Sequence, residues 1–181
     1  MTPEYTIRPV RAHEWRELRA LRLEALQDEA APMAFLESYD VAAARSDEPW
    51  QEYARASSVD GPAAVSRQFV AITEDGTWVG SVVALVERAG TQDYEDTTIE
   101  QDGGHMVAVY LRSEHRGRGV MDRLFAAAAD WLRALGLSRS RLYVHAGNAR
   151  AQGLYERIGF RPTGATFTGS IGPEIEMAMP L

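Results

Sequence analysis

The stretch that decides the fold is residues 105–160, which read HMVAVYLRSEHRGRGVMDRLFAAAADWLRALGLSRSRLYVHAGNARAQGLYERIGF. Residues 105–111 are almost all apolar and predict a buried strand. After a segment rich in glycine and arginine, apolar residues recur at helical spacing over 119–135. A second strand is predicted at 139–145, and a second helix at 148–158 ends at a glycine. The order is therefore strand, loop, helix, strand, helix.

The flanking sequence extends this pattern into one α/β domain over residues 1–181, because no internal repeat, low-complexity tract or linker interrupts it. Helices interrupt the run of strands, so we expect a mixed, mostly antiparallel sheet flanked by helices. Loops are predicted at 57–66, which contains Pro62, and at 89–104. The further predicted strands are 5–10, 68–73, 77–88, 160–168 and 174–180, and the further helices are 13–27 and 47–57.

Composition excludes several classes of function. The net charge is −7 and the pI about 5.1, which argues against broad binding of nucleic acid. The chain has no cysteine, so disulfides, zinc-thiolate sites and a cysteine nucleophile are excluded. The N-terminal residues lack the apolar stretch of a signal peptide, and no run approaches the ~18 apolar residues of a membrane span. We therefore expect a cytoplasmic protein without membrane contact.

Residues 116–121 (RGRGVM) lie between the apolar strand and the amphipathic helix 119–135. Glycines let backbone N–H groups approach an anion closely, and a helix N-terminus adds partial positive charge. The segment is not a Rossmann loop, since Asp122 stands at the position of the third glycine, and no Gly-Lys-Ser/Thr of a P-loop follows. Taken alone, the loop fits a phosphate cradle and a tight turn with solvated arginines equally well.

The second segment, NARAQGLYERIGF at 148–160, decides between these interpretations. Together the two segments resemble, in order and spacing, the signature motifs of the GNAT superfamily of N-acetyltransferases. The first family motif, Arg/Gln-x-x-Gly-x-Gly/Ala, reads Arg116 to Met121 here, with Met121 in place of the last Gly or Ala. The second, Asn-x-x-Ala-x-x-x-Tyr-x-x-x-Gly-Phe, is met at every named position from Asn148 to Phe160. The resemblance implies a GNAT-like domain whose sheet splays between strands 105–111 and 139–145.

The resemblance also implies roles for particular residues. Tyr155 would protonate the departing thiolate of coenzyme A, and Asn148 would hydrogen-bond the pantetheine arm. That arm would pair like an added strand with backbone groups of three residues, one of whose N–H groups would polarise the thioester carbonyl: Val109, Tyr110 and Leu111. The pyrophosphate would be held by backbone amides of the loop and helix start: Arg116, Gly117, Arg118, Gly119, Val120 and Met121.

The role of Tyr155 also makes chemical sense. A free thiol has a pKa of ~8.5 and a tyrosine ~10, so a tyrosine can give up its proton as charge develops on the sulfur. The alternative for Tyr155 is a core tyrosine on the apolar stripe of its helix, with the hydroxyl at the rim. Within the complete motif the catalytic interpretation is favoured.

The acceptor side is much less defined by the sequence. An alkyl ammonium must lose a proton before it attacks, and the base stays open among a water and four residues near strand ends: Glu87, Glu100, His105 and His145. Acceptor contacts are expected from the first helices and the 89–104 loop, namely Phe35, Tyr39, Asp93, Glu95 and Asp96, although such acids are most often solvated. The histidines lack the spacing of metal ligands, so no metal site is expected.

The predicted function is direct acetyl transfer from acetyl-CoA to a primary amine of a small molecule or peptide. Two other functions fit part of the pattern. A non-catalytic acyl-CoA sensor would keep the loop and Asn148 but need no acid or base, and a nucleotide-binding domain would use only the phosphate cradle. A homodimer through the final strands is expected by analogy with the family alone.

Overall fold

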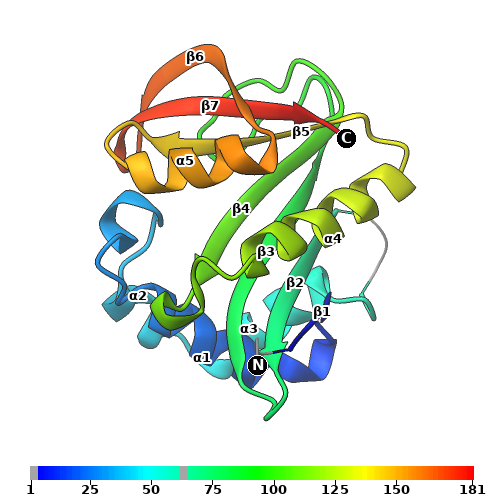
Figure 1. Cartoon of the computed structure of the whole chain (residues 1–181), viewed down its shortest axis with the longest axis vertical. Helices are drawn as coiled ribbons and strands as arrows, with labels where there is room; N and C mark the ends of the chain where they lie inside the picture. Colours follow the sequence, from blue (N-terminus) through cyan, green and yellow to red (C-terminus); the bar gives the residue numbers. More distant parts are fainter. Residues whose placement is uncertain (1–3, 62–64) are drawn as a thin grey trace.

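The computed structural model describes residues 4–61 and 65–181, so Pro62 of the predicted loop 57–66 lies outside the described residues. Seven strands form one sheet in the order β1-β2-β3-β4-β5-β7-β6 (Figure 1). Only β4 and β5 are parallel, and the other neighbours are antiparallel. The mixed, mostly antiparallel sheet is thereby confirmed. The strands are β1 Tyr5–Pro9, β2 Ser66–Thr73, β3 Trp78–Glu87, β4 Gly103–Leu111, β5 Arg139–His145, β6 Arg161–Gly169 and β7 Gly172–Pro180.

The long helices agree closely with the sequence prediction: α1 Trp15–Ala25, α3 Asp47–Ser57, α4 Val120–Ala134 and α5 Ala149–Ile158. The sequence analysis missed α2, Tyr39–Ala43, whose N-cap Ser38 accepts a hydrogen bond from the Val41 N–H. A helix of five residues is too short to show a hydrophobic period. Single 3₁₀ turns occur at Ala12–Glu14, Ala31–Met33 and Ser113–His115. Within the ranges given above, no helix has the length and apolar character needed to cross a bilayer.

The sheet buries both of its faces at β2 and β3, whereas β6 at its edge is mostly exposed. Alternation along β2 sends Phe69 and Ala71 to one face and Val70 and Ile72 to the other. The first face packs under α4, and the second is covered by α1 and α3 (Figure 1). Strand β4 contributes side chains to both of these apolar cores, Met106 and Leu111 to one and Tyr110 to the other. Packing on both faces therefore fixes the position of β4.

The sheet splays between β4 and β5, as expected. Only two residue pairs join these strands, Gly104 with Ser140 and His105 with Arg141. Beyond His105 the strands diverge, and Figure 1 shows the opening between them with α5 above it and α4 beside it. The rest of β4, up to Leu111, therefore has no strand partner on its β5 side.

Candidate active site

The glycine loop leaves its backbone open to a ligand. Gly117 and Gly119 have φ of +75° and +74°, in the left-handed region where glycine is favoured. Gly119 is the N-cap of α4 without a side-chain cap, and a Cβ at either glycine would have nothing within 4 Å. The first amides of a helix have no partner within it, so the start of α4 can accept an anion at this open approach.

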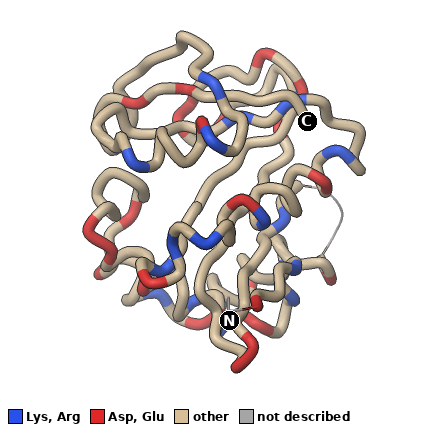
Figure 2. The backbone as a smooth tube through the Cα atoms, in the orientation of Figure 1, with Lys and Arg blue, Asp and Glu red and all other residues tan. Residues whose placement is uncertain are grey.

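Arg116 braces this loop. Its guanidinium lies 2.6 Å from the Asp28 carboxylate and donates to the Leu111 carbonyl oxygen at 2.8 Å. Burial opposes ionisation of Asp28, but hydrogen bonds from the Ala30 N–H and Arg116 outweigh it, so the pKa of Asp28 lies below its ordinary value. Figure 2 marks in blue the arginines of this loop, which leads into α4. The Arg116 side chain thus orients the loop, while Arg118 is exposed.

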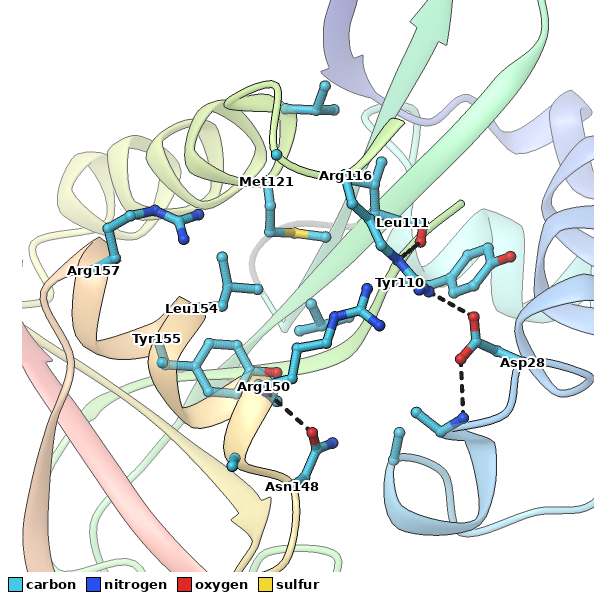
Figure 3. Close-up of a pocket in the computed structure, with 18 of the residues that line it drawn as sticks. Asp28, Tyr110, Leu111, Arg116, Met121, Asn148, Arg150, Leu154, Tyr155 and Arg157 are labelled. Atoms are coloured by element: carbon cyan, nitrogen blue, oxygen red, sulfur yellow. Dashed lines mark hydrogen bonds and ion pairs between the residues drawn. The ribbon is translucent and has the colours of Figure 1, made fainter. Parts of the chain in front are cut away.

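Met121, the departure from the family motif, turns its side chain inward. It is 5% exposed and packs in the same core cluster as Val120 and Leu124. It also lines a cavity of about 390 Å³, where Figure 3 shows it at the wall. We call this space the loop cavity. It is lined by the glycine loop, the end of β4, the start of α5 and the chain after α1, from Asp28 to Phe35.

The loop cavity includes all three β4 residues predicted to bind the pantetheine: Val109, Tyr110 and Leu111. A β-bulge precedes them, because Ala108 has φ +52° and the register with β3 shifts between Ser81 and Val83. A bulge bends its strand and re-aims the groups that follow it. The carbonyl of Leu111 is already bonded to Arg116, and Tyr110 is paired with Ser81 of β3, so the N–H of Leu111 and the backbone of Val109 are the groups left for a ligand.

Asn148 has a second role that the sequence did not reveal. It is the N-cap of α5, and its Oδ1 accepts the Ala151 N–H at 3.1 Å. Its Nδ2 is therefore the donor left for a ligand in the loop cavity, which Asn148 lines. Arg150, two residues later, also lines the cavity and extends across it in Figure 3. Sequence reasoning missed Arg150, although its place in the first turn of α5 was a signal.

Tyr155 lies where the loop cavity meets a second cavity. It is 8% exposed and contacts Phe125 and Phe160, with ring centroids 5.8 and 6.1 Å away. Burial raises the pKa of its hydroxyl above the ordinary value. Within the described part of the chain no hydrogen bond to this hydroxyl accompanies its burial, and it points into the loop cavity in Figure 3. The ring of Tyr155 packs in the core, as the structural interpretation of the sequence expected. Its hydroxyl is still available to a ligand, as the catalytic interpretation requires.

The second cavity has a volume of about 400 Å³, and we call it the sheet cavity. Its walls are β4, β5, β7 and the segment 33–37. It shares six residues with the loop cavity: Ala34, Phe35, Val109, Asn148, Ala151 and Tyr155. Phe35, a predicted acceptor contact, lines both cavities, whereas Tyr39 is exposed and does not line either cavity.

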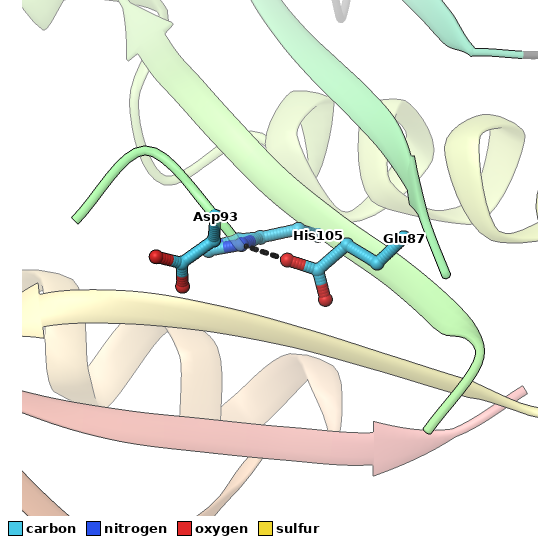
Figure 4. A group of neighbouring side chains, drawn as sticks. All are labelled: Glu87, Asp93 and His105. Atoms are coloured by element: carbon cyan, nitrogen blue, oxygen red, sulfur yellow. Dashed lines mark hydrogen bonds and ion pairs between the residues drawn. The ribbon is translucent and has the colours of Figure 1, made fainter. Parts of the chain in front are cut away.

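Two of the four candidate bases belong to a charge cluster at the point where β4 and β5 are paired. We call Glu87, Asp93, His105, Arg141 and Glu176 the clamp. Arg141 donates to all three carboxylates, and His105 Nδ1 lies 2.8 Å from Glu87 (Figure 4). Burial opposes ionisation of Glu87, but hydrogen bonds from His105 and Arg141 lower its pKa to about 2.

The clamp is a structural anchor. Ligand atoms of Glu87, Asp93 and His105 lie within 4.8 Å of one another, but the Arg141 guanidinium already supplies the positive charge these carboxylates need. Glu87 and His105 do not line either cavity, and Glu100 is exposed. Of the four candidates, only His145 lines the sheet cavity. Its Nδ1 accepts the Gly147 N–H at 3.0 Å.

The loop acids also have partners. Asp93 is held by Arg141 and by the Tyr143 hydroxyl, Glu95 accepts hydrogen bonds from Ser170, and Asp96 is exposed. The sequence analysis missed Glu174 of β7, which lines the sheet cavity at 5% exposure. Nothing in the strand pattern distinguished this residue from Glu176, because only the fold shows which carboxylate has a cation beside it.

The arrangement described so far is an anion-binding helix start and an open strand edge. Residues 15–160 match the sequence pattern of the acetyltransferase (GNAT) family. The chain belongs to the GNAT family. Acetyltransferases of this family use acetyl-CoA as the acetyl donor, and the loop cavity, with its open amides and unpaired strand edge, has the donors that a pyrophosphate and a pantetheine arm need.

Relatives of this GNAT protein differ widely in sequence. N-acetyltransferase 8 of Homo sapiens is 24% identical over 120 residues, which make up 66% of this chain and 53% of that protein. The chain spans about half the length of the human relatives it matches. The PaiA N-acetyltransferase of Thermoplasma acidophilum, solved with coenzyme A, has a TM-score of 0.70 at 17% identity and covers 98% of this chain and 99% of its own.

A second solved structure has the same fold. The spermidine N-acetyltransferase of Vibrio cholerae, in complex with CoA and spermine, has a TM-score of 0.67 at 19% identity. The alignment covers 97% of this chain and 95% of that one. At such identities the likeness shows the fold alone.

Proposed function

We propose that this GNAT protein transfers the acetyl group of acetyl-CoA directly to a primary amine of a small molecule or peptide. The observation that carries the proposal is the junction of the two cavities at Val109 and Tyr155. A thioester at this junction could be reached from the loop cavity by the coenzyme and from the sheet cavity by the acceptor. The two substrates would then react without a covalent enzyme intermediate.

In this reaction, different residues of the chain bind the coenzyme, polarise the thioester and protonate the sulfur. Backbone amides from Arg116 to Met121 hold the pyrophosphate, and Asn148 Nδ2 binds the pantetheine. The backbone of β4 near Val109 orients the thioester and polarises its carbonyl, as donors of an oxyanion hole do. Tyr155 gives its proton to the sulfur, and its raised pKa keeps that proton in place until charge develops there.

An amine acceptor is supported by the chemistry of the sheet cavity. Its walls are mainly apolar, and they carry the carboxylate of Glu174. A carboxylate attracts a cationic amine, and one structural relative is a spermidine N-acetyltransferase solved in complex with CoA and spermine. A homodimer through the final strands and a cytoplasmic location stay predictions of the sequence.

The test measures release of the CoA thiol from acetyl-CoA with spermidine, lysine, tyramine and a peptide with a free N-terminus. We expect turnover with at least one of them. In the Tyr155→Phe variant kcat should fall by roughly 10²-fold, the size of general acid help. The phenyl ring keeps the contacts with Phe125 and Phe160, so CoA affinity should stay within about twofold.

Each alternative function predicts a different result. Tight CoA binding without turnover of any amine would favour the acyl-CoA sensor, and a fully active Tyr155→Phe variant would remove Tyr155 from the mechanism. Calorimetry should show CoA binding more tightly than ATP or NAD. Equal or tighter binding of a nucleotide would contradict the assignment of the loop cavity.

A further inference from the structure

We infer that Glu174 binds the ammonium group of the acceptor and takes its proton, so that β7 supplies the base of the reaction. This inference rests on the proposed function and extends it to a residue and to a class of acceptor.

The register of the sheet places Glu174 on the acceptor side. Glu174 pairs with His145 of the neighbouring strand β5, and both side chains line the sheet cavity. Val144, one residue before His145, also borders this cavity, but its side chain belongs to the core under α4 and α5 on the opposite face of the strand. Val109 and Tyr155 line the same cavity as Glu174, so one space joins its carboxylate to the junction where the thioester lies.

In the part of the chain that the structure describes, no cation forms an ion pair with Glu174. Its Oε2 is buried, and within the described residues it has no hydrogen-bond partner. Glu37, the other acid that lines the sheet cavity, is ion-paired with Arg22 and Arg45. A buried carboxylate without a partner is costly unless a ligand supplies the counter-charge, and an ammonium group has both the charge and the donors to do so.

The groups around Glu174 give its carboxyl a pKa that suits proton transfer from an ammonium. Tyr94 and Glu95 approach from the loop before β4, and Tyr143 and His145 are on β5. Burial, and then the charge of Glu95, raise the pKa of Glu174 to about 7. A base that titrates near neutral pH is half ionised there, and its carboxylate form can take a proton from the bound ammonium before the amine attacks.

The proton balance closes over one turnover. The carboxylate of Glu174 takes one proton from the ammonium, and the nitrogen lone pair forms the C–N bond as the C–S bond breaks. The sulfur takes the proton of Tyr155, and the second proton lost by the nitrogen returns to the phenolate. Glu174 then releases its proton to solvent, so acetyl-CoA and an ammonium become an amide, CoA thiol and one proton.

The walls of the sheet cavity indicate which ammonium fits. Besides the polar groups near Glu174, the lining carries a set of large apolar side chains: Met33, Phe35, Leu36, Met106 and Ile171. Arg22, which also lines the cavity, is paired with Glu37. The acceptor is therefore a primary amine on an apolar or aromatic stem, and tyramine should be a better substrate than lysine, whose carboxylate would have no free cation to meet.

The test is the pH profile of kcat/KM with tyramine for the wild type and Glu174→Gln. The wild type should lose activity below a pH of about 7. In the variant the break in the profile near pH 7 should disappear. The value of kcat/KM should instead rise tenfold per pH unit until the pH reaches the pKa of a free alkyl amine, ~10.4. Near pH 7.5 we expect a loss of roughly 10²-fold, while CoA affinity measured by calorimetry stays unchanged.

Glu95→Gln is the matched control. It keeps an acceptor for Ser170 but removes the charge next to Glu174, so the acid limb should move below pH 7 with the plateau rate retained. In the wild type without ligands, NMR should show one glutamate carboxyl carbon that titrates near pH 7. This titration should be absent from the Glu174→Gln variant.

Two results would overturn the inference. One is a Glu174→Gln variant that keeps both the wild-type rate and its acid limb. The other is equal loss of rate at every pH, which indicates a structural role only. If the wild type acetylates no amine, the proposed function itself fails, so the two failures are distinguishable.

Discussion

Asn148 allows the two roles of one side chain to be separated. Its Oδ1 caps α5 through the Ala151 N–H, while its Nδ2 is the group left for the coenzyme. Asn148→Asp keeps the capping oxygen and replaces only the donor, because Asp and Asn cap helices about equally well. Asn148→Ala removes both.

The expected magnitudes follow from these contacts. Loss of the cap in Asn148→Ala should cost about 1 kcal/mol of unfolding free energy, or about 2–4 °C in Tm for a chain of this size. Asn148→Asp should keep the wild-type Tm. Loss of one hydrogen bond to the coenzyme is worth about 0.5–1.5 kcal/mol, so both variants should bind CoA roughly 2- to 12-fold more weakly.

Thermal unfolding without ligand and calorimetry with CoA measure the two effects independently. Wild-type CoA affinity in Asn148→Asp would refute the contact between Nδ2 and the coenzyme. An unchanged Tm in Asn148→Ala would show that the cap seen in the structure contributes no stability.

Two further predictions concern backbone and charge. Gly119→Ala should cost about 1–2 kcal/mol of stability from its φ of +74° and also weaken CoA binding, because the new methyl group would stand in the open approach to α4. Gly136→Ala, with φ +79° and equally open space at the other end of α4, should lose stability while keeping CoA affinity; parallel effects in both variants would contradict the cradle. The raised pKa of Glu174 means that the folded state binds a proton more tightly than the unfolded state. The free energy of unfolding should therefore fall as pH rises from 4.5 through 7, by up to about 3 kcal/mol, and urea unfolding should show no such component in Glu174→Gln.

Local sequence patterns predicted most of the fold because they act over short distances. The apolar periods of α4 and β5 and the glycine at the end of α4 fixed these elements to within one residue. The two motifs also located the loop cavity, since a glycine loop before a helix is a local device. The five-residue helix α2 is too short to show a hydrophobic period in the sequence, so it was not predicted.

What the sequence did not reveal depends on contacts across the sheet. Glu87 and His105 looked like free bases near strand ends, yet Arg141, far along the chain, holds them in the clamp. From the sequence, Glu174 could not be told apart from other acids on strands. In the described structure Arg141 bonds Glu87, Asp93 and Glu176, and the Oε2 atom of Glu174 has no hydrogen-bond partner. Which carboxylate has a cation beside it is set by tertiary packing, and no spacing rule describes it.

The clamp lies at the vertex of the opening between β4 and β5, where only two residue pairs join the strands. In mechanical terms the vertex is a pivot, and β4 from His105 to Leu111 is the lever arm, about 20 Å long at ~3.3 Å per residue. A rotation of roughly 3° at the pivot would move the far end by about 1 Å, a misplacement that can cost ~10²-fold in rate. Substitutions in the clamp, whose residues do not themselves line either cavity, should thus act on the angle at which donor and acceptor meet.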